Sequence, residues 1–203
     1  TVDGSQPSEL SSVYSSALAI AATTILKYYA KDPAGNAGAV KTQPYIIDLI
    51  PPTGTVKINA DAEWSNVQTV TLTLAATDLN GVSQMRFSND NSNWSSPEVY
   101  ATTKTWSLTS GDGDKMVYVK FMDVAGNWSS AFSKGIILDT APPAVISSLA
   151  TGTYAAPQTI SLSSEAGAFI YYTLDGSDPK TNAGRKIYSA PIVVSVTSTL
   201  KYY

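Results

Sequence analysis

The residues of this chain that could do chemistry are its carboxylates and tryptophans, because it contains no histidine and no cysteine. That absence excludes disulfides, zinc sites made of Cys and His, and every nucleophile–histidine constellation. Paired carboxylates such as Asp112 and Asp114 remain, but these two lie in a glycine-rich turn where solvation is the simpler interpretation. We therefore predict that the chain is not an enzyme and has no catalytic residue.

Four aspartates recur at one fixed spacing and are candidates for calcium binding. Asp123 follows Asp32 by 91 positions (123 − 32), and Asp139 follows Asp48 by the same interval (139 − 48). Calcium takes several oxygen ligands, and an Asp with backbone carbonyls at a hinge would supply them. The sequence thus predicts calcium at the domain junctions. The alternative is that Asp32 and Asp123 only cap their own turns, as Asp commonly does.

Two tryptophans follow turn sequences and are candidates for contact with a glycan. Trp94 comes after Asn91-Ser92-Asn93, and Trp128 comes after the Gly126-Asn127 turn. An exposed indole offers a flat apolar face to a sugar ring, with a polar N–H at its edge. The alternative is that each ring packs over an edge of the fold, which large aromatic side chains often do.

A strand that runs into a turn recurs along the chain and positions these candidates. Leu26-Lys27-Tyr28-Tyr29 precedes the Asp-x-Ala-Gly-Asn turn at Asp32, and Leu200-Lys201-Tyr202-Tyr203 repeats it 174 positions later (200 − 26). The turn itself recurs at Asp123. Such fixed-period similarity indicates tandem domains. Alternating apolar residues before both turns are typical of strands that cover a core on one side.

Two proline pairs, Pro51-Pro52 and Pro142-Pro143, mark the expected domain boundaries. Proline ends a strand because it has no N–H to donate to a ladder. We predict an all-β fold of tandem immunoglobulin-like Greek-key β-sandwiches, one complete and two partial. The predicted domains are residues 1–48, 49–140 and 141–203. Strands of the complete domain are expected near residues 55–59, 69–77, 83–88, 103–108, 116–123 and 130–139.

The composition limits the partners. The chain has 203 residues, of which 43% are hydrophobic and 14% charged, with a net charge of −3. It has no basic block, so nucleic acid and anionic membrane surfaces are not expected partners. No apolar run reaches the roughly 20 residues of a membrane helix. A cysteine-free, weakly charged β-chain favours an extracellular location.

The terminal segments resemble a known family. Tyr171-Tyr172-Thr173 followed by Asp-Gly-Ser-x-Pro, with the Leu-Lys-Tyr-Tyr strand and Asp-x-Ala-Gly-Asn turn, is similar to the chitobiase/β-hexosaminidase C-terminal-type domain. Residues 168–203 carry its first half and residues 1–48 its second half. The middle segment, with residues 81–88 (Gly-Val-Ser-Gln-Met-Arg-Phe-Ser) and 117–121 (Val-Tyr-Val-Lys-Phe), resembles bacterial immunoglobulin-like repeats of long surface proteins. Such adhesins also place an Asp before a proline linker, so the resemblance implies calcium at Asp48 and Asp139.

The resemblance implies a structural repeat segment of a long extracellular bacterial surface protein: a stalk, an adhesin shaft or a filament. The alternative is a carbohydrate-binding or spacer module of a secreted glycan-active enzyme. The expected partners are neighbouring repeats of the same protein, together with a glycan or cell-surface ligand. Two ways of completing the partial domains remain open. Either neighbouring sequence completes them covalently, or another copy binds head-to-tail and the chains form a filament.

Overall fold

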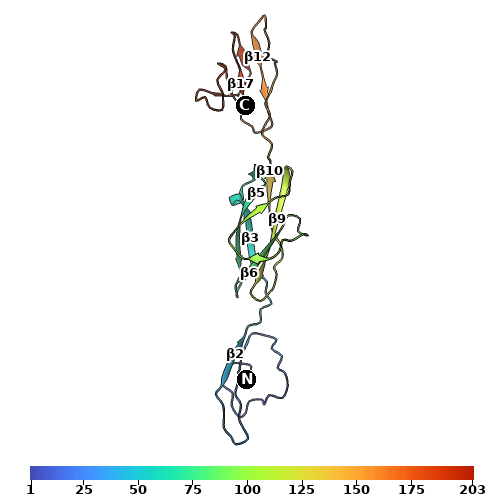
Figure 1. Cartoon of the computed structure of the whole chain (residues 1–203), viewed down its shortest axis with the longest axis vertical. Helices are drawn as coiled ribbons and strands as arrows, with labels where there is room; N and C mark the ends of the chain where they lie inside the picture. Colours follow the sequence, from blue (N-terminus) through green and yellow to red (C-terminus); the bar gives the residue numbers. More distant parts are fainter. The chain divides into compact units, whose positions relative to one another are not determined.

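The computed structural model describes all residues from 1 to 203, and its regular secondary structure is almost entirely β-strand, joined by turns and irregular segments (Figure 1). Its one helical segment is the short 3₁₀ turn η1 (Asn59–Asp61). The chain contains no helix with the length and apolar character needed to cross a membrane. The residues group into two compact units, Thr1–Thr140 and Ala141–Tyr203. The predicted all-β class is confirmed.

Residues 53–138 form a β-sandwich of two sheets within the first unit (Figure 1). The smaller sheet contains β3 (Thr53–Ile58), β5 (Thr69–Thr77) and β8 (Thr103–Ser107), in that order. The larger has the order β4-β10-β9-β6-β7. Its strands are β4 (Trp64–Ser65), β6 (Val82–Ser88), β7 (Glu98–Val99), β9 (Gly113–Asp123) and β10 (Phe132–Leu138). All neighbours are antiparallel except β4 and β10, which run parallel.

One core fills the space between these two sheets because apolar residues alternate with polar ones along the strands. In β5 the inward residues are separated by threonines, and in β9 three inward residues are completely buried. The buried members of the core are Val56, Ile58, Val70, Leu72, Leu74, Met85, Phe87, Leu108, Val117, Val119, Phe121, Ile136 and Leu138. The outward side chains of β6 and β9 are therefore held on a rigid two-layer base.

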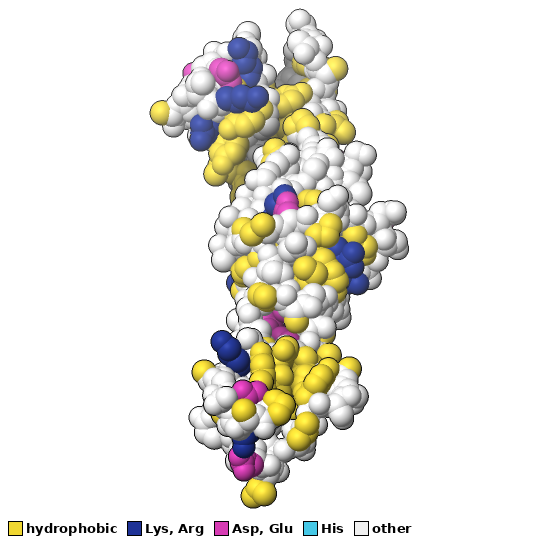
Figure 2. Space-filling view, turned by 60° about the horizontal axis from the view of Figure 1, so that its bottom comes forward, with side chains coloured by type: hydrophobic (Ala, Val, Ile, Leu, Met, Phe, Trp, Pro, Cys, Tyr) yellow, Lys and Arg dark blue, Asp and Glu magenta, His cyan; other side chains and the backbone are white.

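Residues 1–48 form an open structure with no core of their own. β1 (Thr24–Tyr28) pairs antiparallel with β2 (Lys41–Tyr45). The first residues add a third strand-like segment, since Lys27 N donates to Thr1 O at 3.1 Å. No residue of this segment is buried, and Figure 2 shows hydrophobic side chains gathered on its surface.

The second unit has three small sheets around a small core. Its sheets are β11-β13, β12-β16 and β15-β14-β17. The buried core residues are Leu162, Ile170 and Ile192. The strands are β11 (Ile146–Ser147), β12 (Gln158–Ile160), β13 (Leu162–Ser163), β14 (Tyr171–Thr173), β15 (Lys186–Ile187), β16 (Ile192–Val194) and β17 (Lys201–Tyr202).

Candidate functional site

The two Asp-x-Ala-Gly-Asn turns have the same hydrogen bonds. Asp123 Oδ1 accepts from Asn127 N at 2.8 Å and Oδ2 accepts from Asn127 Nδ2 at 2.8 Å. Asp32 accepts from Asn36 N and Nδ2 at the same distances. Each aspartate therefore caps its own turn. The two differ in burial, because Asp123 is fully buried and Asp32 is exposed.

Three carboxylates gather beside the first proline pair. Asp48 lies after β2, Asp78 lies in the turn after β5, and Asp123 ends β9. One ligand oxygen of each lies within 4.8 Å of the others. Asn127 Nδ2 links two of these residues, since it donates to the Asp123 carboxylate and to the backbone carbonyl Asp48 O at 3.0 Å. Asn80 Nδ2 donates to Asp48 Oδ2 at 2.8 Å. Two turns of the sandwich thus contact the junction residue.

The structure brings together only two of the four aspartates proposed from the sequence. Asp48 and Asp123 meet, whereas Asp32 remains in its own exposed turn. Asp139 lies at the end of β10, where its N–H donates to Ser65 O at 2.9 Å. The third member, Asp78, was missed because its Asp-Leu-Asn-Gly sequence is also an ordinary turn signal. Its place beside Asp48 depends on the sandwich topology.

The electrostatics of Asp123 favour its ionised form. Burial raises the pKa of this carboxyl, but hydrogen bonds from Asn127 and from the backbone of the turn outweigh burial. The pKa of Asp123 therefore lies below its ordinary value. A buried carboxylate kept ionised in this way contributes negative charge to the three-aspartate cluster.

The two candidate tryptophans meet around one cation on the outer face of the larger sheet. Arg86 Cζ lies 4.4 Å from the ring centroid of Trp128 and 5.2 Å from that of Trp94. Lys120 Nζ lies 4.9 Å from the centroid of Trp94. All four side chains are partly exposed. Sequence reasoning selected the two rings, but it missed the cations that the sheet places between and beside them.

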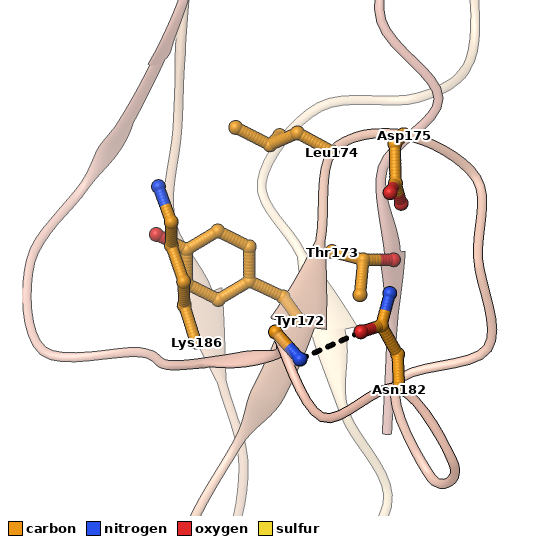
Figure 3. Close-up of a pocket in the computed structure, with 7 residues that line it drawn as sticks. Tyr172, Thr173, Leu174, Asp175, Asn182 and Lys186 are labelled. Atoms are coloured by element: carbon orange, nitrogen blue, oxygen red, sulfur yellow. Dashed lines mark hydrogen bonds between the residues drawn. The ribbon is translucent and has the colours of Figure 1, made fainter.

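A shallow hollow in the second unit, about 290 Å³ in volume, lies beside β14 and β15 (Figure 3). The side chains of Asp175 and Asn182, which line it, bond to the loops that form it. Asp175 Oδ1 accepts from Ser177 N at 3.0 Å and from Ser177 Oγ at 2.6 Å. Gly184 N donates to Asn182 Oδ1 at 2.7 Å, and Asn182 Nδ2 donates to Ser177 Oγ. These bonds fix the loops around the hollow.

The fold and the repeated segments define a protein of tandem immunoglobulin-like repeats. Residues 1–42 and 149–203 match the family described as chitobiase/beta-hexosaminidase C-terminal domain. This match confirms the resemblance predicted for both ends of the chain. A comparison with curated proteins finds no match.

The solved structures that are similar to the chain include the following three. Fibronectin(III)-like modules of Clostridium thermocellum CbhA are 12% identical, with a TM-score of 0.39 over 73% of this chain and 84% of theirs. A tetra-tandem repeat in the extending region of a large adhesion protein is 16% identical, with a TM-score of 0.38 over 89% and 48%. Dimeric latent PorU from Porphyromonas gingivalis is 14% identical, with a TM-score of 0.31 over 89% and 20%. The chain thus spans about half of the second structure and a fifth of the third.

Proposed function

We propose that the chain is a structural repeat segment of a long extracellular bacterial surface protein, part of a stalk, adhesin shaft or filament. Its role is to connect neighbouring repeats. Each partial domain completes its core with residues that adjoin this segment. The repeats in the sequence and the family match of both ends support this proposal. The observation that carries it is a difference in burial between equivalent residues of the two ends.

Equivalent apolar residues are covered in the second unit and uncovered in residues 1–48. Ile192 is 6% exposed, whereas its counterpart Leu18 is 53% exposed. Tyr188 packs against the core of the second unit, whereas Tyr14 is 73% exposed. The cover in the second unit comes from the segment before Thr173, through Val145, Ile160, Leu162 and Ile170. The first segment therefore presents a face that fits a copy of residues 144–172.

The backbones of the two ends agree with this equivalence. Thr173 pairs with Lys201, and Thr1 exchanges backbone hydrogen bonds with Lys27 in the same manner. Gly176 N donates to Thr199 O at 2.9 Å, and Gly4 N donates to Ile25 O at 3.1 Å. Residues 1–48 thus already have the backbone arrangement on which a copy of residues 144–172 would pack.

Joining a second copy of residues 144–172 directly before Thr1 tests the proposal, because it recreates the Tyr172–Thr173 connection. We expect amide hydrogen exchange in β1 to slow at least about tenfold, since the added segment buries an exposed strand and its apolar face. Hydrogen exchange measured by mass spectrometry gives the readout.

A matched control carries Leu162→Ser and Ile170→Ser in the added copy only, and it should restore fast exchange. Unchanged exchange with the unmodified copy would argue against completion by a neighbouring repeat.

A second copy of the chain, bound head-to-tail, could also cover the exposed apolar face of residues 1–48. Light scattering that shows concentration-dependent polymers of the 203-residue chain would favour head-to-tail binding. A strictly monomeric chain would favour completion by covalently adjoining sequence.

Calcium at the first junction stays a prediction, and the cluster of Asp48, Asp78 and Asp123 supports it. The donor set suits calcium, which prefers several carboxylate and carbonyl oxygens. Bound calcium would offset two of the three negative charges of these carboxylates and stiffen the connection at the first proline pair. We expect calcium to raise the melting temperature by binding the folded state, with about 2.7 kcal/mol of stabilisation at 100-fold excess over Kd.

Calorimetry with Asp48→Asn and Asp78→Asn variants measures the calcium effect, and Asp32→Asn is the matched control outside the cluster. The first two variants should lose the heat of binding, whereas the control should keep it. An unchanged melting curve together with no heat of binding would contradict the prediction that this cluster binds calcium.

The second candidate function is an accessory module of a secreted glycan-active enzyme. The family description of the two ends and the paired tryptophans favour it. The neighbouring sequence separates the two candidates. Further repeats would support the structural role, whereas an adjoining catalytic domain would support the accessory one.

A further inference from the structure

Two cations lie directly opposite each other on the outer face of the sandwich. Arg86 of β6 is in register with Lys120 of β9. Like charges in facing positions of neighbouring strands repel each other and destabilise the pair. No carboxylate relieves this repulsion, because the four ion pairs of the chain involve other lysines. Neither side chain donates a hydrogen bond to another group of the protein.

Two equivalent loops deliver the tryptophans to this charged pair. In the first, Ser95 Oγ accepts from Phe87 N at 3.0 Å, and Ser95 N donates to Phe87 O at 2.8 Å. In the second, Ser129 Oγ accepts from Phe121 N at 3.0 Å, and Ser129 N donates to Phe121 O at 2.9 Å. Both loops thus close onto neighbouring strands through fully buried phenylalanines. The residue directly before each of these serines is the tryptophan, so both rings are held over the same part of the sheet.

The rings hold the cations in place but leave their hydrogen-bonding capacity unused. A cation over an indole face is attracted by the ring, which offsets part of the repulsion. A guanidinium carries its N–H groups in its own plane, and neither indole contact of Arg86 is a hydrogen bond to one of them. Its Nε is buried without a partner. The site therefore keeps two positive charges and several free donors beside two partly exposed indoles.

We infer that Arg86 and Lys120, with Trp94 and Trp128, bind a carboxylate-bearing sugar of an acidic polysaccharide. The guanidinium fork matches a carboxylate in a bidentate manner, and the ammonium adds a second charge. A pyranose ring that carries the carboxylate brings a flat apolar face to the indoles. Acidic peptides share the carboxylate, but they attach it to a flexible chain that lacks this rigid apolar surface. The inference goes beyond the structural role proposed above, and its test leaves that proposal untouched.

Binding of trigalacturonate to the 203-residue chain tests the inference. Isothermal titration calorimetry should show binding that weakens at higher salt, because charge attraction contributes to it. The matching neutral trisaccharide, galactotriose, should bind at least about tenfold more weakly because it lacks the carboxylates that pair with the cations. Arg86→Gln should weaken trigalacturonate binding by about tenfold or more, and Lys120→Gln by a smaller factor.

Lys57→Gln is the matched control, because Lys57 lies in the same sandwich and pairs with Asp61 instead. It should bind trigalacturonate like the unchanged chain. Arg86→Lys keeps the charge without the fork and should still bind more weakly, and near-UV circular dichroism checks that each variant is folded. Three results would overturn the inference: no trigalacturonate binding at millimolar concentration, equal affinity for galactotriose, or triglutamate binding as tight as that of trigalacturonate.

Discussion

Residues 53–140 expressed alone should unfold in one cooperative thermal transition, whereas residues 1–48 alone should show none. The first fragment contains every member of the large core, from Val56 to Leu138, and both sheets that enclose it. The second contains no buried residue, and an isolated two-stranded hairpin is at best marginally stable in water. Circular dichroism during heating measures both fragments.

The Phe121→Ala variant of the larger fragment is the control for a packed core. Phe121 is completely buried, and removing such a ring costs about 3–5 kcal/mol. The melting temperature should therefore fall sharply, or the cooperative transition should be lost altogether. A disordered 53–140 fragment would contradict the predicted boundary of the complete domain, and a cooperative 1–48 fragment would contradict the need for a neighbouring repeat.

The strands that the sequence predicts well are those with a long alternation of apolar and polar residues. The strand expected at residues 69–77 is observed as β5 with the same bounds, and that expected at 83–88 is β6. Two short strands were missed. β4 has two residues and pairs parallel with β10, which is distant in sequence, and β7 also has two. Two residues cannot show a periodicity, so only the tertiary structure defines them.

The predicted turn at residues 111–114 shows a related limit. Glycine and aspartate indicate a turn, but β9 already begins at Gly113, which pairs with Leu138. Local turn chemistry does not fix where a ladder starts, because the partner strand decides how far pairing extends. Boundaries are therefore less predictable than the existence of the strand itself.

The candidate sites divide in the same way. The recurring aspartates and tryptophans could be selected by residue type and spacing alone. Asp78 and Arg86 could not be selected in this way, because each becomes a candidate only through the residue that lies beside it in the fold. Asp78 meets Asp48 through two turns of the sandwich, and Arg86 meets Lys120 through strand register. Convergence of residues from separate strands requires the topology, which spacing does not give.

Asp123→Asn should destabilise the sandwich, whereas the equivalent change Asp32→Asn should leave its unfolding unchanged. Asp123 is buried and accepts two hydrogen bonds from Asn127, and an asparagine would turn an N–H donor toward one of these donors. Leaving a buried partner unsatisfied costs about 1–3 kcal/mol. Asp32 makes the same bonds at an exposed turn, where water can replace them. Tryptophan fluorescence in urea without calcium reports the sandwich alone, because all four tryptophans lie within residues 64–128.

The pH dependence of this destabilisation separates the charge from the shape of the side chain. Because the pKa of Asp123 is lowered in the folded state, its carboxylate stabilises the fold above the ordinary pKa of 3.8. That contribution is lost as the pH falls from about 4 through the lowered folded pKa. The asparagine variant has no such proton to bind, so its stability should fall less steeply on acidification, and the two curves should converge at low pH. Parallel curves from about pH 7 to pH 2 would mean that the ionised form of Asp123 contributes nothing to the fold.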